Sequence, residues 1–374
     1  MLTEFEMSGY RKFDNLLLKN LKRINIFLGD NNTGKTSVLE AIYMWCNGKS
    51  LYPTLQYGVN RRFLRNPTNP YEIVEAILAI VNENYAKKSE YPINLKAQYN
   101  GKTVEFLHKI VPGPLFFDMN ESMHDVYGYQ NVNNDMIYKM DKMPYQINTA
   151  IGNTQNSYIA KWDIETNITE KIEYDLVFPY QYNSNIPAYA LAKFVDMFDY
   201  KNTSELARIL TVLKRTNKIE SFINDINKMY GDIAGFDLLR LHSYGTDTVF
   251  VKNSSNEYLP INSYGDGLQR SYSILGNFVL YPKAIICIDE IDTTLHYTTL
   301  NLFNNLILKY SKKYNNQLFL TSHNKEWLDS FLSCAEKMKS LDEINVFRLN
   351  NKKNINISGT KAIELRNEFG MELR

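Results

Sequence analysis

The run GDNNTGKT at residues 29–36 has the spacing G-x-x-x-x-G-K-[ST], which is typical of a loop that holds phosphate groups. Its glycines let backbone N–H groups close around an anion, and a helix that begins there adds positive potential. Lys35 is expected to neutralise the β- and γ-phosphate oxygens, and the Thr36 hydroxyl to ligate Mg²⁺. The predicted nucleotide contacts are Asn31, Asn32, Thr33, Gly34, Lys35, Thr36 and Ser37. The alternative is a chance match in a loop rich in Gly and Asn, which the strand–loop–helix context disfavours.

A second candidate site is the acidic pair Asp289-Glu290, which ends the apolar run at residues 284–288. This pattern predicts a Walker B strand, in which Asp289 holds Mg²⁺ and Glu290 orients or deprotonates the attacking water. A buried strand that merely ends at an acidic loop is the alternative. The presence of the phosphate loop makes that alternative unlikely to account for both motifs.

Two further segments have the residue types to bind a γ-phosphate. The run SYGDGLQR at residues 263–270, called the signature segment below, precedes a predicted helix. A serine and glycine backbone at a helix start can bind an anion, which indicates phosphate contacts for Ser263 and Gly265. His323 follows the next apolar strand and can donate a hydrogen bond to the γ-phosphate. Taken singly, an ordinary turn and a strand-end histidine are the alternatives; their order relative to Lys35 and Asp289 favours the phosphate contacts.

A second segment that binds the γ-phosphate also has a consequence for assembly. One phosphate loop already occupies the near side of a nucleotide. The signature segment is therefore expected to act from an opposing copy of the chain.

The elements that must position these residues are those of an α/β domain. Residues 284–288 and 318–320 are continuous apolar runs, as expected for strands buried on both faces of a parallel sheet. The short apolar run at 24–28, bounded by Gly29, also suits a buried strand. After the phosphate loop, apolar residues recur at helical spacing from Val38 to Trp45. The order of these elements fits an α/β domain that is interrupted by an insertion.

The middle of the chain shows other patterns. Asn100-Gly101 separates two alternating segments, 93–99 and 102–108, and predicts a hairpin; residues 157–163 and 171–178 indicate a second one. Apolar residues at i, i+3, i+4 and i+7 predict two amphipathic helices within 187–231, with residues 202–204 capping the first. Heptads long enough for a coiled-coil arm are absent from the sequence.

Composition narrows the class of protein. Of 374 residues, 44% are apolar and 22% are charged, which is ordinary for a globular protein. The formal net charge of +1 gives no global basic field, although a local basic stripe stays open. Cys46, Cys287 and Cys334 form no C-x-x-C pair, which argues against a zinc hook and a disulfide framework and for a reducing compartment.

Targeting signals are also missing from the sequence. The first residues lack the basic and apolar regions of a signal peptide. The best apolar stretch, 274–288, is interrupted by Asn277, Pro282 and Lys283, so it is not expected to span a membrane. We therefore expect a cytoplasmic protein without membrane contact.

The strings GDNNTGKT (29–36), GDGL (265–268) and DEIDTTLHY (289–297) together resemble those of the ABC-type ATPase heads of the RecF, SMC and OLD (overcoming lysogenisation defect) group. The chain looks like the stand-alone OLD-like ATP-binding proteins of bacterial anti-phage defence loci. The resemblance covers residues 1–48 and 259–330. It implies an α/β fold of the ABC/SMC head type, with a mixed β-sheet, flanking helices and a helical and β insertion. It also implies ATP, Mg²⁺ and a head-to-tail dimer or higher oligomer.

The resemblance implies a three-part division and further roles. Residues 1–110 would form the N-terminal lobe of the head, 111–255 the insertion, and 256–374 the C-terminal lobe. Ser263 and Gly265 would act in trans, Asp292 would lie in a D-loop at the dimer seam, and His323 would be the switch histidine. The signature segment reads Ser-Tyr-Gly-Asp-Gly where Ser-Gly-Gly-Gln is common.

Two expectations from the resemblance leave alternatives open. Arg11, in GYRKF at residues 9–13, is a candidate nucleotide contact, with a surface loop as the equal alternative. Gln56 and Gln98 are both candidates for the Q-loop residue.

The function expected from the resemblance is that of an oligomeric ATP-driven sensor or scaffold in anti-phage defence. The residues after His323 are too few for a Toprim nuclease domain, so the effector (Toprim-like or a toxin) is expected to be a separate polypeptide. The alternative is a RecF-like repair ATPase that binds DNA. A nucleotide-gated binding module without hydrolysis is disfavoured, because it would not need Glu290.

Overall fold

The computed structural model of the chain describes residues 1–47, 82, 91–110, 158–166, 171–178, 190–196, 199–240, 247–350 and 355–369. Contacts divide the chain into two compact units. We call them the α/β unit (Met1, Asn20–Tyr43 and Ala190–Arg374) and the β unit (Leu2–Lys19 and Met44–Tyr189). The predicted three-part division at residues 111 and 256 stays a prediction, because most of 111–189 lies outside the described residues.

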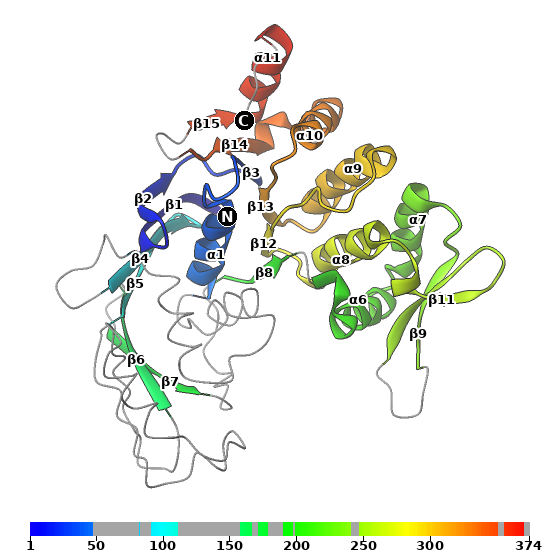
Figure 1. The fold of residues 1–374 in the computed structure, drawn as a ribbon, viewed down its shortest axis with the longest axis horizontal. Helices are drawn as coiled ribbons and strands as arrows, with labels where there is room; N and C mark the ends of the chain where they lie inside the picture. Colours follow the sequence, from blue (N-terminus) through cyan, green and yellow to red (C-terminus); the bar gives the residue numbers. More distant parts are fainter. Residues whose placement is uncertain are drawn as a thin grey trace, which may run out of the picture. The chain divides into compact units, whose positions relative to one another are not determined.

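The α/β unit contains a six-stranded mixed sheet with the order β15-β14-β3-β13-β12-β8 (Figure 1). Its strands are β3 (Ile24–Leu28), β8 (Ala192–Val195), β12 (Ile285–Ile288), β13 (Gln317–Thr321), β14 (Ile344–Arg348) and β15 (Ile355–Ser358). All neighbouring pairs are parallel except β14 and β15. Every residue of β3, β12 and β13 is buried, as the continuous apolar runs predicted. The predicted mixed α/β fold is therefore confirmed.

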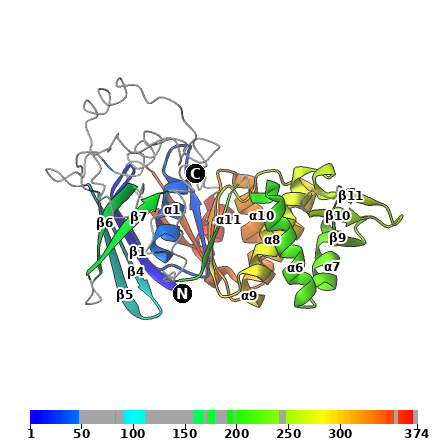
Figure 2. The same cartoon turned by 90° about the horizontal axis from the view of Figure 1, so that it is seen from below.

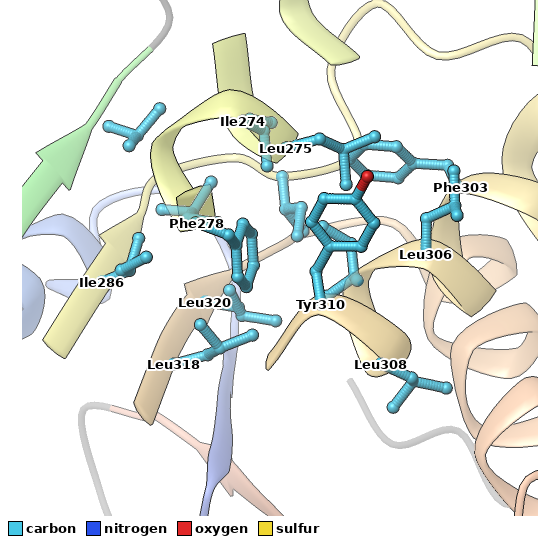
Figure 3. Close-up of a cluster of buried hydrophobic side chains, with 14 of the residues drawn as sticks. Ile274, Leu275, Phe278, Ile286, Phe303, Leu306, Leu308, Tyr310, Leu318 and Leu320 are labelled. Atoms are coloured by element: carbon cyan, nitrogen blue, oxygen red, sulfur yellow. The ribbon is translucent and has the colours of Figure 1, made fainter. Parts of the chain in front are cut away.

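Helices cover this sheet and close its core. They are α1 (Lys35–Cys46), α8 (Asp266–Leu280), α9 (Tyr297–Lys313), α10 (Lys325–Lys337) and α11 (Gly359–Phe369). Figure 3 shows Phe278 of α8 and Tyr310 of α9 packed over Ile286 of β12 and Leu318 of β13. Burial of these large side chains fixes the strand ends that carry the polar residues of the candidate site.

A second layer of the α/β unit consists of α6 (Thr203–Arg215), α7 (Ile219–Tyr230) and a three-stranded antiparallel sheet. That sheet comprises β9 (Gly235–Leu239), β10 (Thr248–Lys252) and β11 (Tyr258–Pro260). Helix α6 contacts α8 on one side and β9 and β10 on the other (Figure 2). The two predicted amphipathic helices are confirmed, and Asn202 caps the first by accepting the Glu205 N–H at 3.2 Å.

The β unit is built around an antiparallel sheet with the order β2-β1-β4-β5-β6-β7. Its strands are β1 (Leu2–Tyr10), β2 (Phe13–Leu18), β4 (Tyr91–Tyr99), β5 (Lys102–Ile110), β6 (Tyr158–Thr166) and β7 (Lys171–Phe178). Both predicted hairpins are confirmed: β4 pairs with β5 across Asn100 and Gly101, and β6 pairs with β7. The indole Nε1 of Trp45 donates to the Val104 carbonyl at 3.2 Å and ties the end of α1 to β5.

No helix among the described residues combines the length and the apolar character that a membrane span requires.

Candidate functional site

The phosphate loop lies between β3 and α1, where the strand–loop–helix pattern predicted it. Gly29 has a φ of 146°, and a Cβ there would lie 2.6 Å from the Leu349 carbonyl oxygen. Thr33 closes the loop by donating its N–H and hydroxyl to the Asp30 carbonyl, at 3.3 and 2.8 Å. Only glycine fits at position 29, because any side chain would collide with the backbone and with Thr33.

The predicted nucleotide contacts differ in exposure. Asn31 and Asn32 are exposed, Gly34, Lys35 and Thr36 are half-buried, and Thr33 and Ser37 are buried. Asn32 and Gly34 both have positive φ, 62° and 91°. Residues with positive φ on either side of one without it can turn backbone N–H groups inward, as in an anion-binding nest.

Lys35 is folded back over its own loop. Its Nζ donates to the carbonyls of Gly29 and Asp30 at 2.7 and 2.8 Å. Burial lowers the pKa of Lys35, and the charges of Asp289 and Glu290 oppose that shift. The ammonium group is thus held at the mouth of the loop with acidic residues around it.

Thr36 and Asp289 meet across the end of the sheet. The Thr36 hydroxyl donates to Oδ1 and Oδ2 of Asp289, at 3.0 and 3.1 Å. The Thr321 hydroxyl, from the end of the neighbouring strand β13, donates to Oδ1 of the same carboxylate at 2.7 Å. Asp289 is 3% exposed, and these contacts fix its orientation. A carboxylate and a hydroxyl in contact are the hard oxygen ligands that Mg²⁺ prefers.

Glu290 follows in an unusual backbone conformation, with a φ of 50°. Its N–H donates to Thr321 Oγ1 at 2.7 Å, and Thr293 Oγ1 donates to Glu290 Oε2 at 3.4 Å. Arg270 of α8 donates from Nη2 to the carbonyls of Asp289 and Glu290, at 2.9 and 2.7 Å. These contacts hold the backbone of Glu290 at both its N–H and its carbonyl.

Thr321 and Arg270 were not among the site residues predicted from the sequence. Thr321 directly precedes Ser322 and His323 at the end of an apolar strand, and this position could have identified it as a candidate site residue. No sequence pattern identified Arg270, because the carbonyls to which it donates lie 19 and 20 residues further along the chain.

His323 lies beside the phosphate loop. It is exposed at the end of β13 and lines a cavity of about 220 Å³. The other polar residues of this cavity are Gly29, Asp30, Asn31, Ser322, Asn324, Lys325 and Asp329. The structure therefore brings the phosphate loop and the segment after β13 together around one cavity.

The signature segment begins at the 3₁₀ helix Ile261–Ser263 and continues into α8. Ser263 and Gly265 are exposed, and Gly265 is the residue that precedes the first turn of α8. A Cβ at Gly265 would meet nothing within 4 Å. The chain thus presents this helix start to its surroundings.

Another acidic residue, Asp196, directly follows β8 and was not predicted. The Asp289 N–H donates to the Val195 carbonyl at 3.0 Å, which places Asp196 at the same strand edge as Asp289. Asp196 is buried, and its Oδ1 accepts the Asp199 N–H at 3.2 Å.

The remaining candidates lie elsewhere. Arg11 is in the β unit, between β1 and β2, with a φ of 50° and its guanidinium over the Tyr10 ring. Its nucleotide contact stays a prediction. Gln98 lies in the antiparallel strand β4 of the β unit, and Gln56 lies outside the described residues.

Comparison with known proteins gives three findings. Residues 151–329 match the family described as "AAA domain, putative AbiEii toxin, Type IV TA system". An "ATP/GTP phosphatase" of Helicobacter pylori (strain ATCC 700392 / 26695) is 21% identical over 88% of this chain and 87% of that protein. The DNA replication and repair protein RecF of Clostridium botulinum (strain Okra / Type B1) is 26% identical over 85% of this chain and 96% of that protein. Several other RecF proteins match over 13–23% of their own length.

Solved structures agree on the fold. An SMC head bound to the C-terminal winged-helix domain of ScpA covers 97% of this chain and 99% of its own, with a TM-score of 0.53 and 12% identity. The fold is that of an SMC head, and the chain carries the phosphate loop and the acidic strand end that are typical of P-loop ATPases. The chain is similar to the RecF protein and to the ATP/GTP phosphatase over most of its length.

Proposed function

We propose that two copies of this chain bind Mg²⁺-ATP between them and that each copy hydrolyses the nucleotide at the end of its own β12. One observation carries this proposal: Thr36 of the phosphate loop and Thr321 of β13 both donate to the Asp289 carboxylate, one residue before Glu290. The residues to which we assign nucleotide binding and water activation therefore lie at one strand end, which supports the proposal.

Binding rests on the phosphate loop. The backbone N–H groups of residues 31–34 and the start of α1 supply positive potential for the β-phosphate. Lys35 would exchange its contacts with the Gly29 and Asp30 carbonyls for phosphate oxygens. Each exchange replaces a neutral acceptor with a charged one, which strengthens the hydrogen bond.

Thr36 and Asp289 are the residues that would hold Mg²⁺. Their oxygens already lie in contact, and they are of the type and hardness that the ion requires. When bound, Mg²⁺ supplies positive charge against the β- and γ-phosphate oxygens.

Glu290 would act on the attacking water. A carboxylate at this place accepts the proton that the water loses as it approaches the γ-phosphorus. Thr321 and Arg270 hold the Glu290 backbone, so little reorganisation is needed when substrate binds. His323, beside the phosphate loop, would donate to a γ-phosphate oxygen.

The opposing copy would complete the site. Ser263 and Gly265 are exposed at the N-terminus of α8, a helix of 15 residues. N–H groups and the helix dipole at such an end stabilise an anion. In a head-to-tail pair this end would cap the γ-phosphate, with Asp292 at the seam and Arg11 as a further candidate contact.

The test is the substitution Glu290→Gln. It removes the proton acceptor and leaves the phosphate contacts intact, so hydrolysis should fall by about 10²- to 10⁴-fold while ATP binding is retained. The variant should form a dimer with ATP that sedimentation detects, whereas Lys35→Ala should neither bind ATP nor dimerise. Hydrolysis at the unmodified rate in Glu290→Gln would refute the assigned role.

At the cellular level, we propose an oligomeric sensor or scaffold that controls a separately encoded effector in anti-phage defence. The family description, which names a putative AbiEii toxin of a type IV toxin–antitoxin system, favours this role, as does the OLD-like pattern of motifs. Deletion of the gene in its native host should raise phage sensitivity. A neighbouring gene product should co-purify with the Glu290→Gln variant in ATP, and the absence of both effects would refute the role.

A RecF-like role in DNA repair is the second candidate, and the 26% identical RecF of C. botulinum favours it. It requires DNA affinity that depends on ATP and falls steeply with salt concentration. The net charge of +1 supplies no general attraction to DNA. Binding of duplex DNA by the ATP-closed dimer at physiological salt would favour repair over defence.

A further inference from the structure

Arg270 is a costly residue to bury. It is 1% exposed, and its Nε and Nη1 have no hydrogen-bond partner among the residues that the structure describes. Burial lowers the pKa of its guanidinium, against the charges of Asp292, Glu290 and Asp289. A buried guanidinium with two unpaired nitrogens destabilises a fold relative to an apolar side chain of similar size. Packing alone therefore gives no reason for an arginine here.

The remaining guanidinium nitrogen of Arg270 makes its hydrogen bonds just after the end of β12. Nη2 donates to the carbonyls of both Asp289 and Glu290, at 2.9 and 2.7 Å. The Glu290 residue has a φ of 50°, which an L-residue adopts only when its surroundings hold it there. Arg270 and Thr321 are the two side chains that hold its backbone, one at the carbonyl and one at the N–H.

A second contact joins α8 to the segment after Glu290. A Cβ at Gly267 would lie 3.0 Å from the Thr294 carbonyl oxygen, so the first turn of α8 lies directly against that backbone. Thr294 itself has a φ of 70°, which is strained for a β-branched residue. Asp292 lies in the sequence between Glu290 and Thr294. Its buried Oδ1 also has no hydrogen-bond partner among the described residues. The first turns of α8 and residues 289–294 thus form one contiguous group.

We propose that Arg270 is a positioning residue that couples the signature segment to Glu290 of the same chain. This inference rests on the proposed function, in which the start of α8 caps the γ-phosphate held by the opposing copy. A shift of α8 on capping moves the Arg270 guanidinium, and with it the carbonyl of Glu290. Hydrolysis at the chain's own site then depends on whether its signature segment is engaged at the other site.

If Arg270 couples the signature segment to Glu290, its loss should lower the rate of hydrolysis without changing the affinity for nucleotide. Arg270 touches neither the phosphate loop nor the exposed residues Ser263 and Gly265 in any hydrogen bond of the described residues. Its loss is therefore expected to leave nucleotide affinity intact. Misplacement of Glu290 by about 1 Å is enough to lower turnover by about a hundredfold.

The experiment compares Arg270→Met with the unmodified chain, with Glu290→Gln and with a matched control, Arg208→Met. Arg208 lies on α6 with 57% of its side chain exposed, and its Nη1 donates to the Tyr281 hydroxyl at 3.0 Å. Four quantities are measured: kcat, KM for ATP, the affinity for a non-hydrolysable ATP analogue, and Tm. The double variant Arg270→Met/Glu290→Gln is tested for dimerisation with ATP.

Arg270→Met should lower kcat by about ten- to a hundredfold, keep KM and analogue affinity within about twofold, and leave Tm near that of the unmodified chain. Arg270→Lys should recover part of kcat, because an ammonium can donate to the same carbonyls. The double variant should still dimerise with ATP, and Arg208→Met should behave as the unmodified chain.

Two other results would overturn the inference. Turnover of Arg270→Met at the unmodified rate would exclude a positioning role while the proposed function stands. Parallel losses of kcat, affinity and Tm would assign Arg270 to folding alone. If the unmodified chain does not hydrolyse ATP and Glu290→Gln does not dimerise, the proposed function itself fails.

Discussion

Thr36, Asp289 and Thr321 come from three segments that lie far apart in the sequence, and their side chains converge within 3.1 Å. Each threonine hydroxyl donates to the same carboxylate, so these contacts fix the orientation of the Asp289 side chain. Aspartate that accepts such bonds in a buried place is well suited to a divalent cation. These three hydrogen bonds therefore orient the carboxylate that we assign to the metal ion.

Thr36→Val tests the assignment of the metal ligands. It replaces the hydroxyl by a methyl group of similar volume, so it removes one metal ligand and one donor to Asp289. The Mg²⁺ concentration for half-maximal hydrolysis should rise by at least about tenfold, because loss of a ligand or its support has that effect. Titration of Mg²⁺ at saturating ATP measures it.

Thr36→Ser is the matched control, since serine keeps the hydroxyl. Its Mg²⁺ dependence should stay within about threefold of the unmodified chain. Equal Mg²⁺ dependence of the valine variant and the serine variant would contradict the assignment of Thr36 as a ligand.

Among the elements, α8 connects the two ends of the site. Its N-terminus carries the signature segment, its second turn reaches β12 through Arg270, and its third turn packs against α6 at Gly276. A Cβ at Gly276 would collide with the side chain of Ile209, so glycine allows the two helices to approach closely.

Gly276→Ala is therefore expected to destabilise the α/β unit. Alanine gains about 1 kcal/mol over glycine in helix propensity, and overpacking of the α6–α8 contact costs about 1–3 kcal/mol. We expect a net loss of up to about 2 kcal/mol in the free energy of unfolding, measured by urea denaturation.

A double-mutant cycle with Ile209→Ala supplies the control for Gly276→Ala. The added methyl group can then occupy the space that Ile209 leaves. The double variant should be more stable than the sum of the two single changes predicts, by about 0.5–3 kcal/mol. Additive effects would show that the two helices do not meet at this point.

The elements also show how far sequence alone reaches. The phosphate loop, the acidic strand end and the hairpin at Asn100-Gly101 were predictable, because local spacing and turn chemistry determine them. All four residues of the helical pattern that begins at Val38, namely Val38, Leu39, Ile42 and Trp45, are buried as the period required.

Contacts between distant segments were not predictable in this way. The pairing of β8 with β12, which brings Asp196 beside Asp289, joins residues about ninety positions apart. Strands β9 to β11 escaped prediction because polar residues interrupt β9 and bound β10, and β11 is only three residues long. Arg270 was missed because a buried arginine that bonds to backbone carbonyls leaves no pattern in the sequence.

At the scale of the whole molecule, we propose that one chain carries two halves of a phosphate site. The cradle lies at the end of β3, where the phosphate loop, Asp289 and Glu290 meet. The cap is the exposed start of α8, with Ser263 and Gly265. In the proposed dimer each copy contributes the cradle of one site and the cap of the other.

A mixing experiment tests this sharing most directly. Lys35→Ala removes the cradle and Ser263→Arg blocks the cap, so each variant alone should hydrolyse ATP at less than about a hundredth of the unmodified rate. A mixed dimer still has one intact site, formed by the cradle of the Ser263→Arg chain and the cap of the Lys35→Ala chain. We predict that ATP joins the two variants into mixed dimers that bind one nucleotide each, detected by sedimentation, although neither variant dimerises with ATP alone. Hydrolysis in these dimers should stay below half the unmodified rate, because the signature segment of the Ser263→Arg chain has no phosphate to cap. An equimolar mixture in which ATP joins no mixed dimers, and which binds no more ATP than its components, would contradict the shared site.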